Sequence, residues 1–206
     1  MSDTPRLPAP SETARFGVMM NRSADLKRRI ATELAETLIA VIDACEGSLR
    51  AGGKLMFCGN GGSAADSQHL ATEMLIRLRG SVERPSFAAL ALTQDASMLT
   101  AGGNDYGYDH VFERPLRGLG RAGDVLFGIT TSGRSANVVL ALKAAREMGI
   151  VTVGLLGGPG VPASDFCDHA LLVPDHETAR IQECHIALGH AVLELLEDRL
   201  VARPIV

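Results

Sequence analysis

The sequence predicts an α/β fold in which a parallel sheet carries helices on both faces. Its length of 206 residues is enough for one compact domain with a buried core. Five short runs of apolar residues are typical of buried strands, and helical stretches separate them along the chain. Because the strands of a parallel sheet are covered on both sides, they lack the alternation of polar and apolar residues seen in one-sided sheets.

The expected elements follow one another from the N-terminus. Residues 1–22 are expected to form a leader, partly helical, and residues 23–206 a single domain. Apolar side chains recur at helical spacing from Ser23 to Arg50, where two glycines end the helix. A glycine-rich loop is expected at 102–107, after a helical stretch. The expected strands are 54–59, 87–92, 124–131, 151–157 and 169–174, and the remaining expected helices are 63–79, 109–119, 135–148 and 178–200.

The composition argues against several classes of protein. With a net charge of −4 and no tryptophan, the chain offers no basic surface for nucleic acid or anionic membranes and no platform for stacking bases. We therefore expect no nucleic-acid partner and no membrane partner. The N-terminus lacks the apolar segment of a secretory signal, and no apolar run approaches the roughly 18 residues that cross a bilayer. The four cysteines form no C-x-x-C pair, which favours buried thiols in a reducing compartment and a cytoplasmic protein.

The first candidate binding loop runs from Cys58 to Ser63, between an expected strand and an expected helix. Its three glycines let the backbone approach a ligand closely, and Ser63 occupies the position expected for the N-cap. A helix start offers unpaired N–H groups and the positive end of its dipole to an anion. The loop lacks the spacing of a dinucleotide fingerprint and the lysine of a nucleotide P-loop. A tight structural turn is the alternative.

The second candidate loop, Thr130 to Ser135, also joins a strand to a helix. Four hydroxyl groups surround a glycine at the helix start, an arrangement that suits a phosphate without any lysine. An N-cap followed by a turn is the alternative. Ligands of parallel α/β sheets bind at the carboxyl ends of the strands. Because both loops lie at such ends, we predict a site for a small phosphorylated ligand.

The helix expected at 63–79 carries a stripe of charged side chains. His69, Glu73 and Arg77 follow one another at i, i+4 spacing, and Asp66 precedes them. An imidazole one turn before a carboxylate is a workable pair of metal ligands. A solvated charged face is the alternative reading.

The terminal helix carries polar residues among apolar ones. Gln182, His185 and His190 alternate there with isoleucine, leucine and valine. A histidine in such surroundings is usually a core residue with its hydrogen bonds satisfied, so His190 alone indicates nothing.

Four segments of the chain resemble the signatures of the phosphoheptose isomerases, which are sugar-isomerase (SIS) domain enzymes. In order they are CGNGGSAADSQHLATE, GGNDYGYDHVF, GDVLFGITTSGRSANV and TARIQECHIALGH. The resemblance extends from about residue 23 to residue 200. It implies a flavodoxin-like three-layer sandwich around a five-stranded parallel sheet, with an additional N-terminal helix. It also implies a homotetramer with active sites at subunit interfaces, in which that helix serves oligomerisation.

The resemblance assigns roles to particular residues. It implies that Glu73 is the catalytic carboxylate and His190 the catalytic imidazole. In zinc-containing members of the family, the positions of His69, Glu73, Gln182 and His190 hold the metal, so one zinc ion per subunit is expected. The implied substrate-binding residues are Asn60, Gly61, Gly62, Ser63, Glu73, Asn104, Asp105, Thr130, Thr131, Ser132, Ser135 and Gln182.

The implied activity is aldose–ketose isomerisation through an enediol. The substrate would be sedoheptulose 7-phosphate and the product D-glycero-D-manno-heptose 7-phosphate, in the first step of bacterial heptose precursor synthesis. One positioned base and one positioned acid are sufficient for this proton transfer. A zinc ion would add a Lewis acid at the developing enediolate oxygen.

Two alternatives stay open at this point. Some SIS relatives are regulators without enzymatic activity, including a bacterial replication-initiator-binding protein. Those relatives lack the acidic residue at the Glu73 position and the histidine at the His190 position, and both residues are present here. The other alternative is an isomerase for a pentose or hexose phosphate, because motifs do not reveal the length of a pocket.

Overall fold

A single parallel sheet forms the centre of the chain. The computed structural model describes residues 11–205, so the first ten residues of the expected leader and residue 206 lie outside the described part. The strands run in the order β2-β1-β3-β4-β5, all parallel. They are β1 (Leu55–Gly59), β2 (Ala89–Ala91), β3 (Val125–Thr130), β4 (Val151–Gly157) and β5 (His169–Val173). The predicted five-stranded parallel sheet is confirmed, although β2 is shorter than the expected 87–92.

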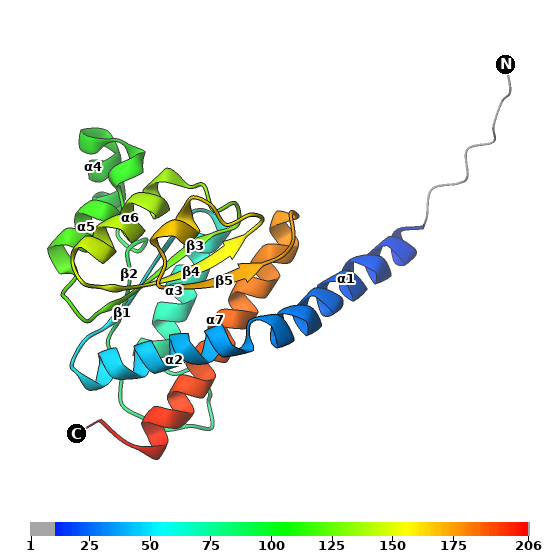
Figure 1. Ribbon diagram of the computed structural model, residues 1–206, viewed down its shortest axis with the longest axis horizontal. Helices are drawn as coiled ribbons and strands as arrows, with labels where there is room; N and C mark the ends of the chain where they lie inside the picture. Colours follow the sequence, from blue (N-terminus) through cyan, green and yellow to red (C-terminus); the bar gives the residue numbers. More distant parts are fainter. Residues whose placement is uncertain (1–10, 206) are drawn as a thin grey trace, which may run out of the picture.

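Helices cover both faces of this sheet. They are α1 (Glu12–Glu33), α2 (Ala35–Arg50), α3 (Gly62–Leu75), α4 (Ala96–Tyr106), α5 (Glu113–Leu119), α6 (Ala136–Glu147) and α7 (Thr178–Ala202), with 3-10 turns η1 (Tyr108–His110) and η2 (Ala163–Phe166). Helices α2, α3 and α7 lie against one face, and α5 and α6 against the other (Figure 1). The result is the expected three-layer sandwich.

The sheet divides the core into two apolar clusters, because successive strand residues point to opposite faces. Phe57 and Phe127, from neighbouring strands, stack with ring centroids 4.8 Å apart on the side of α2, α3 and α7. Met56 and Leu126 point the other way, toward α5 and α6. All four side chains are almost completely buried, so both faces of the central strands are withdrawn from water.

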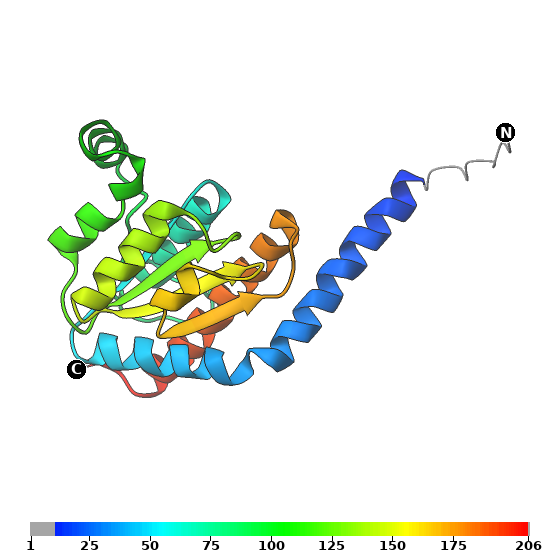
Figure 2. The same cartoon turned by 45° about the horizontal axis from the view of Figure 1, so that its top comes forward.

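The N-terminal helix differs from the single helix expected over 23–50. It begins at Glu12, because the Ser11 hydroxyl accepts a hydrogen bond from the Ala14 N–H at 3.2 Å and caps the helix. It is interrupted at Leu34, whose φ of −108° and ψ of 3° leave the helical region. Figure 2 shows α2 lying along the sheet and α1 projecting away from it.

Three other expected elements are also corrected. The glycine-rich loop expected at 102–107 is mostly part of α4, which is capped by the Asp95 carboxylate and ends at Gly107, where φ is 84°. Helix α3 ends at Leu75, so Arg77 does not extend its charged stripe. The helix expected at 109–119 is divided into η1 and α5.

All four cysteines are free, and Cys45, Cys58 and Cys184 are buried. None of the helices between residues 11 and 205 combines the length and the apolar character that crossing a bilayer requires.

One histidine of α7 is completely buried in the core. His185 is 0% exposed, and burial lowers the pKa of its imidazole to about 4. In the unfolded chain the group titrates near its ordinary pKa of about 6.5. Between these values the unfolded state takes up a proton that the folded state does not. The free energy of unfolding therefore falls as the pH drops from about 6.5 toward 4.

We predict that wild-type protein loses roughly 2 kcal/mol more unfolding free energy between pH 7 and pH 5 than the His185→Leu variant does. The measurement is urea denaturation at both pH values, with a chelator present to remove any contribution from bound metal. An equal pH dependence in the two proteins would contradict a neutral, enclosed imidazole.

Candidate active site

The carboxyl ends of β1 and β3 lie next to each other at the centre of the sheet. Strand β1 leads into α3 on one face, and β3 leads into α6 on the other. This is the switch point of a sheet with the order 2-1-3-4-5, where ligands of such folds bind. The two loops singled out in the sequence therefore share one edge of the sheet.

The first loop enters α3 through glycines. Gly61 has a φ of 57° and acts as the N-cap, so α3 begins at Gly62 and not after Ser63. The prediction of Ser63 as the N-cap is wrong, because a glycine can adopt the left-handed conformation that starts the helix two residues earlier. Ser63 is instead buried within the first turn, and its N–H donates to the Asn60 carbonyl at 3.0 Å.

Asn60 connects the two loops directly. Its side-chain N–H donates to the Asn137 carbonyl oxygen at 2.8 Å, and Asn137 donates back to the Asn60 oxygen at 2.9 Å. The Tyr108 hydroxyl donates to the same Asn60 oxygen at 3.0 Å. Asn137 is 2% exposed and also accepts from the Val138 N–H at 2.9 Å. The loop after β1 is thereby fixed to the first turn of α6.

The second loop gathers hydroxyl groups at the start of α6. The Thr130 hydroxyl lies 3.0 Å from that of Ser135 and 3.4 Å from that of Ser132, whose oxygen accepts from the Arg134 N–H at 3.1 Å. Thr131 lies between them, with its carbonyl packed against Gly157. Gly133 has a φ of 68° and lies so close to Gly160 that a side chain would not fit. The backbone therefore turns sharply there and brings the hydroxyls together.

Farther along α3, three predicted residues converge. His69 Nε2 lies 2.8 Å from His190 Nε2 on α7 and 3.3 Å from a carboxylate oxygen of Glu73, one turn later on α3. The side chain of Glu73 is 17% exposed and that of His69 is 45% exposed, so a ligand can reach the group. Asp66, one turn earlier, has a carboxyl oxygen that is buried and has no hydrogen-bond partner among the described residues. Burial raises the pKa of Asp66, and His69 opposes that shift.

These three side chains suit a divalent metal. Each of His69, Glu73 and His190 presents one ligand atom, and the atoms lie within 4.8 Å of one another. Two imidazole nitrogens and a carboxylate oxygen leave a coordination position for a further ligand. Without a cation between them, the Nε2 atoms of His69 and His190 can lie 2.8 Å apart only when one of them carries a proton and donates it to the other.

Helices α3 and α7 lie side by side and run in the same direction. Gln182 lies against the start of α3, where a Cβ on Gly62 would stand 2.5 Å from its amide nitrogen. Farther along, a Cβ on Gly189 would stand 2.7 Å from a methyl carbon of Leu70. The absence of side chains at these two glycines lets the helices approach closely. His69 and His190 are the sequence neighbours of Leu70 and Gly189, so they lie beside the second contact.

The remaining predicted residues lie apart. Asn104 and Asp105 are exposed on α4, and within residues 11–205 their only side-chain hydrogen bond joins the two to each other, at 2.7 Å. Helix α4 has no buried residue. The structure of one chain therefore does not bring this pair to either loop or to the His69 group.

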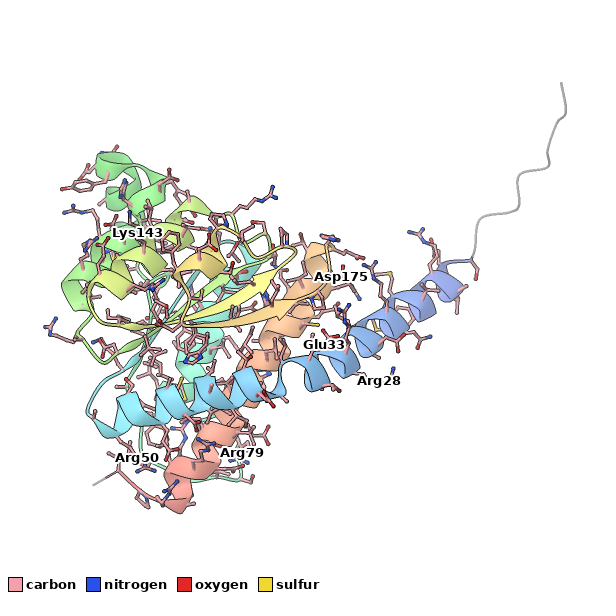
Figure 3. All side chains as sticks on the ribbon, viewed as in Figure 1. Arg28, Glu33, Arg50, Arg79, Lys143 and Asp175 are labelled. Carbon is pink, nitrogen blue, oxygen red and sulfur yellow. The ribbon has the colours of Figure 1, made fainter. Side chains whose placement is uncertain are left out.

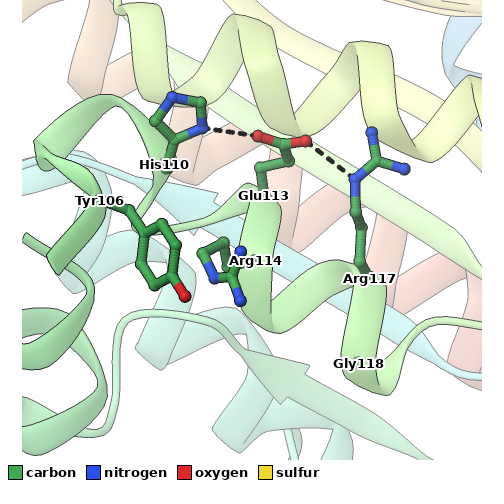
Figure 4. A pocket seen from close by; sticks show the side chains of 6 residues that line it. All are labelled: Tyr106, His110, Glu113, Arg114, Arg117 and Gly118. Carbon is green, nitrogen blue, oxygen red and sulfur yellow. Dashed lines mark hydrogen bonds and ion pairs between the residues drawn. The ribbon is translucent and has the colours of Figure 1, made fainter.

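A separate hollow of about 620 Å³ lies between α4 and α5 (Figure 4). None of the predicted site residues lines it. Glu113 accepts hydrogen bonds from Arg117 and His110, each at 2.8 Å. Burial alone would raise the pKa of Glu113, but these two partners lower it below its usual range. The guanidinium of Arg114 lies 3.6 Å above the ring centre of Tyr106.

Sequence reasoning missed three residues that support the site. Asn137 and Tyr108 hold Asn60, and Arg84 binds the end of α3 that carries Glu73. The position of Asn137, directly after the hydroxyl loop and at the start of an expected helix, was a usable signal in the sequence. Arg84 had no local signal, because its charged partner, Glu197, is 113 residues away and its nearer partners are backbone carbonyls.

Comparison with known proteins finds a SIS domain and relatives that are named phosphoheptose isomerases. The family model described as "SIS domain" matches residues 20–157. The phosphoheptose isomerase of Pelodictyon phaeoclathratiforme is 50% identical over 86% of this chain and 85% of that protein. The phosphoheptose isomerase of Akkermansia muciniphila is 54% identical over 76% of this chain and 82% of that protein.

Solved structures agree with these relatives. The phosphoheptose isomerase of Neisseria gonorrhoeae is 43% identical with a TM-score of 0.85, covering 91% of this chain and all of that one. The phosphoheptose isomerase of Francisella tularensis is 31% identical with a TM-score of 0.87, covering 92% of this chain and all of that one. The matched range of the family model includes both loops and the helix α3 that carries His69 and Glu73.

Proposed function

The chain belongs to the phosphoheptose isomerases of the SIS-domain family, and we propose that Glu73 and His190 are its catalytic pair. The reaction is the conversion of sedoheptulose 7-phosphate to D-glycero-D-manno-heptose 7-phosphate, in heptose biosynthesis. The observation that carries the proposal is the convergence of Glu73, His69 and His190 on one point between α3 and α7. The four free thiols favour a cytoplasmic location.

The reaction moves a carbonyl group from C2 to C1 through an enediol. Glu73 takes the proton from C1 and returns it to C2, because a carboxylate is a suitable base for a carbon-bound proton. His190 supplies a proton to the oxygen on C2 and accepts one from the oxygen on C1. An imidazole suits this exchange because it can give and take protons near neutral pH. We propose this division of roles because the carboxylate suits the carbon-bound protons and the imidazole suits the oxygen-bound ones.

The phosphate end of the substrate needs a separate binding site. The Thr130 hydroxyl lies 3.4 Å from that of Ser132 and 3.0 Å from that of Ser135, beside the start of α6. The first N–H groups of a helix have no partner within it and suit an anion. We propose that Asn60, Gly61, Gly62 and Ser63 form the opposite wall, because hydrogen bonds between Asn60 and Asn137 join their loop to α6. We propose that Thr131 and Gln182 complete this wall.

We propose zinc, held by His69, Glu73 and His190. The Gln182 amide, expected as a further ligand, lies against Gly62 about two turns of α7 before His190, so within one chain it is not adjacent to this group. When bound, zinc supplies a Lewis acid that stabilises negative charge on the substrate oxygens. Imidazole and carboxylate ligands suit zinc, and the clustering of three such groups supports the choice.

A homotetramer is the proposed assembly. An apolar groove of about 400 Å³ runs between α1, α2 and α7 and is lined by Lys27, Ile30, Ala31, Leu34, Ala35, Leu38, Ile39, Ala187, Leu188, Ala191 and Leu195. Phe16 and Val18, on the projecting part of α1, are 61% and 67% exposed. Exposed apolar surfaces of this kind are typical of subunit interfaces. Association would also let Asn104 and Asp105 contribute to a site at the interface between subunits.

Two alternatives can be compared with this proposal. A regulatory role without catalysis has no use for the paired Glu73 and His190, whose proximity favours an enzyme. A shorter phosphosugar would use the same loops, so only kinetics separates it from the heptose.

We predict that Glu73→Gln lowers kcat at least about a hundredfold, because the amide cannot accept a proton. Ser132→Ala is the matched variant, which should raise KM through loss of a phosphate contact and leave kcat nearly unchanged. Turnover of sedoheptulose 7-phosphate and exchange of its C1 protons in heavy water can be followed by NMR. If Glu73→Gln exchanges the C1 protons at the wild-type rate, Glu73 is not the base, and the regulatory alternative is again supported.

Elemental analysis of protein purified without chelator should find close to one zinc ion per chain. His69→Ala should lower the zinc content and the affinity measured against a chromophoric chelator. His176→Ala, at an exposed histidine outside the group, is the control and should retain the metal. Full turnover after complete removal of zinc would end the proposed Lewis-acid role.

Light scattering should give the mass of four chains at micromolar concentration. Ile39→Glu together with Leu195→Glu places charges in the apolar groove and should produce smaller species, because both side chains are 42% exposed in the single chain. Lys143→Glu, at an exposed position of α6, is the control for the change of charge. A wild-type monomer would refute the assembly.

A further inference from the structure

Arg84 is a buried charged residue in the segment that joins α3 to β2. Its side chain is 1% exposed, although the segment from residue 77 to residue 88 contains neither helix nor strand. Burying a guanidinium is costly unless each part of it is bound. In this structure its three nitrogens have four partners: three backbone carbonyls and one carboxylate.

Two of those carbonyls belong to the last turn of α3. Arg84 donates to the Glu73 carbonyl at 2.6 Å and to the Met74 carbonyl at 3.0 Å. Ser86 donates to the next carbonyl, that of Leu75, at 2.6 Å, and the Phe87 N–H also donates to Met74. The last carbonyls of a helix have no partners within it, and a positive charge there opposes the negative end of the dipole. The backbone of Glu73 is therefore held by Arg84.

The fourth partner of Arg84 is Glu197 on α7. The Arg84 Nε donates to one oxygen of this carboxylate at 2.6 Å, and Arg79, labelled in Figure 3, donates to the other at 2.7 Å. The Glu197 side chain is 1% exposed. It follows His190 by seven residues, about two turns, so both side chains lie on the same face of α7.

One side chain thus connects the backbone of Glu73 to the face of α7 that carries His190. Directly beside the His69 group, the approach of Gly189 to Leu70 also brings the helices together. Between these two contacts, the spacing of α3 and α7 cannot change without breaking buried hydrogen bonds. Lysine does not replace arginine here, because its single ammonium cannot reach the carbonyls and the carboxylate in the required plane.

We propose that Arg84 is a positioning residue, which acts through Glu197 to hold Glu73 and His190 at their working separation. The proposal rests on the proposed function in that it takes Glu73 and His190 as the reacting pair. This positioning role is different from stabilising the fold, because a buried ion pair often contributes little net free energy to folding. Its consequence is that disturbing Arg84 affects the chemical step and the metal group more than substrate binding.

The test compares Arg84→Lys with Lys54→Met. Lys54 forms a 2.5 Å ion pair with Asp124, whose side chain is also 1% exposed, at the opposite end of β1 and β3. Asp124 keeps hydrogen bonds from the Lys54 and Arg121 N–H groups, so the control variant should fold. Both variants are measured for melting temperature, kcat, KM and zinc affinity by chelator competition.

We expect Arg84→Lys to lower kcat about tenfold or more, change KM less than about twofold, and weaken zinc about ten- to a hundredfold. Lys54→Met should lower the melting temperature and leave kcat and zinc affinity near wild type. If Arg84→Lys does not fold, Glu197→Gln, which keeps the shape of the side chain, should give the same pattern. Wild-type kcat and zinc affinity in a folded Arg84→Lys or Glu197→Gln variant would overturn the proposal.

The experiment separates this proposal from the proposed function. A wild-type protein that does not convert sedoheptulose 7-phosphate would overturn the function, while weaker zinc binding in Arg84→Lys would still support positioning of the group. An active wild type with unaffected variants at Arg84 and Glu197 would overturn only the positioning role.

Discussion

The close packing of α3 against α7 is the contact on which the candidate site depends. Both helices follow parallel strands and lie on the same face of the sheet, so they run in the same direction. Glycines at 62 and 189 remove the side chains that would separate them. His69 and His190 can therefore meet at 2.8 Å although 121 residues separate them in the sequence. A bulkier interface would keep the helices apart and leave two isolated histidines on two surfaces.

Much of the architecture was predictable because its signals are local. The five apolar runs at the strands, the alternation with helices and the loops at the ends of β1 and β3 can be read within short windows. The strand order depends on pairs of distant segments, and the sequence did not predict it. The contact between α3 and α7 entered the prediction only through the resemblance to a known family, which implied that His69 and His190 share a metal. The interruption at Leu34 and the helical conformation of Gly102 and Gly103 show the limits of local propensity.

The candidate site divides in a similar way. Residue types identified His69, Glu73 and the hydroxyl loop, because imidazole, carboxylate and hydroxyl groups at those spacings have recognisable chemistry. The start of α3 was predicted incorrectly at Ser63, because a positive φ at Gly61 depends on the whole loop. Asn137 and Arg84 escaped notice because their partners, Asn60 and Glu197, are 77 and 113 residues away.

The reciprocal amide pair of Asn60 and Asn137 has a consequence for the energetics of ligand capture. Each amide both donates to and accepts from the other, and the Tyr108 hydroxyl adds a third bond, so the two loops lose their conformational freedom when the chain folds. A ligand that arrives later need not order them again. The entropic cost belongs to folding and not to association, which is how preorganisation raises affinity without additional contacts.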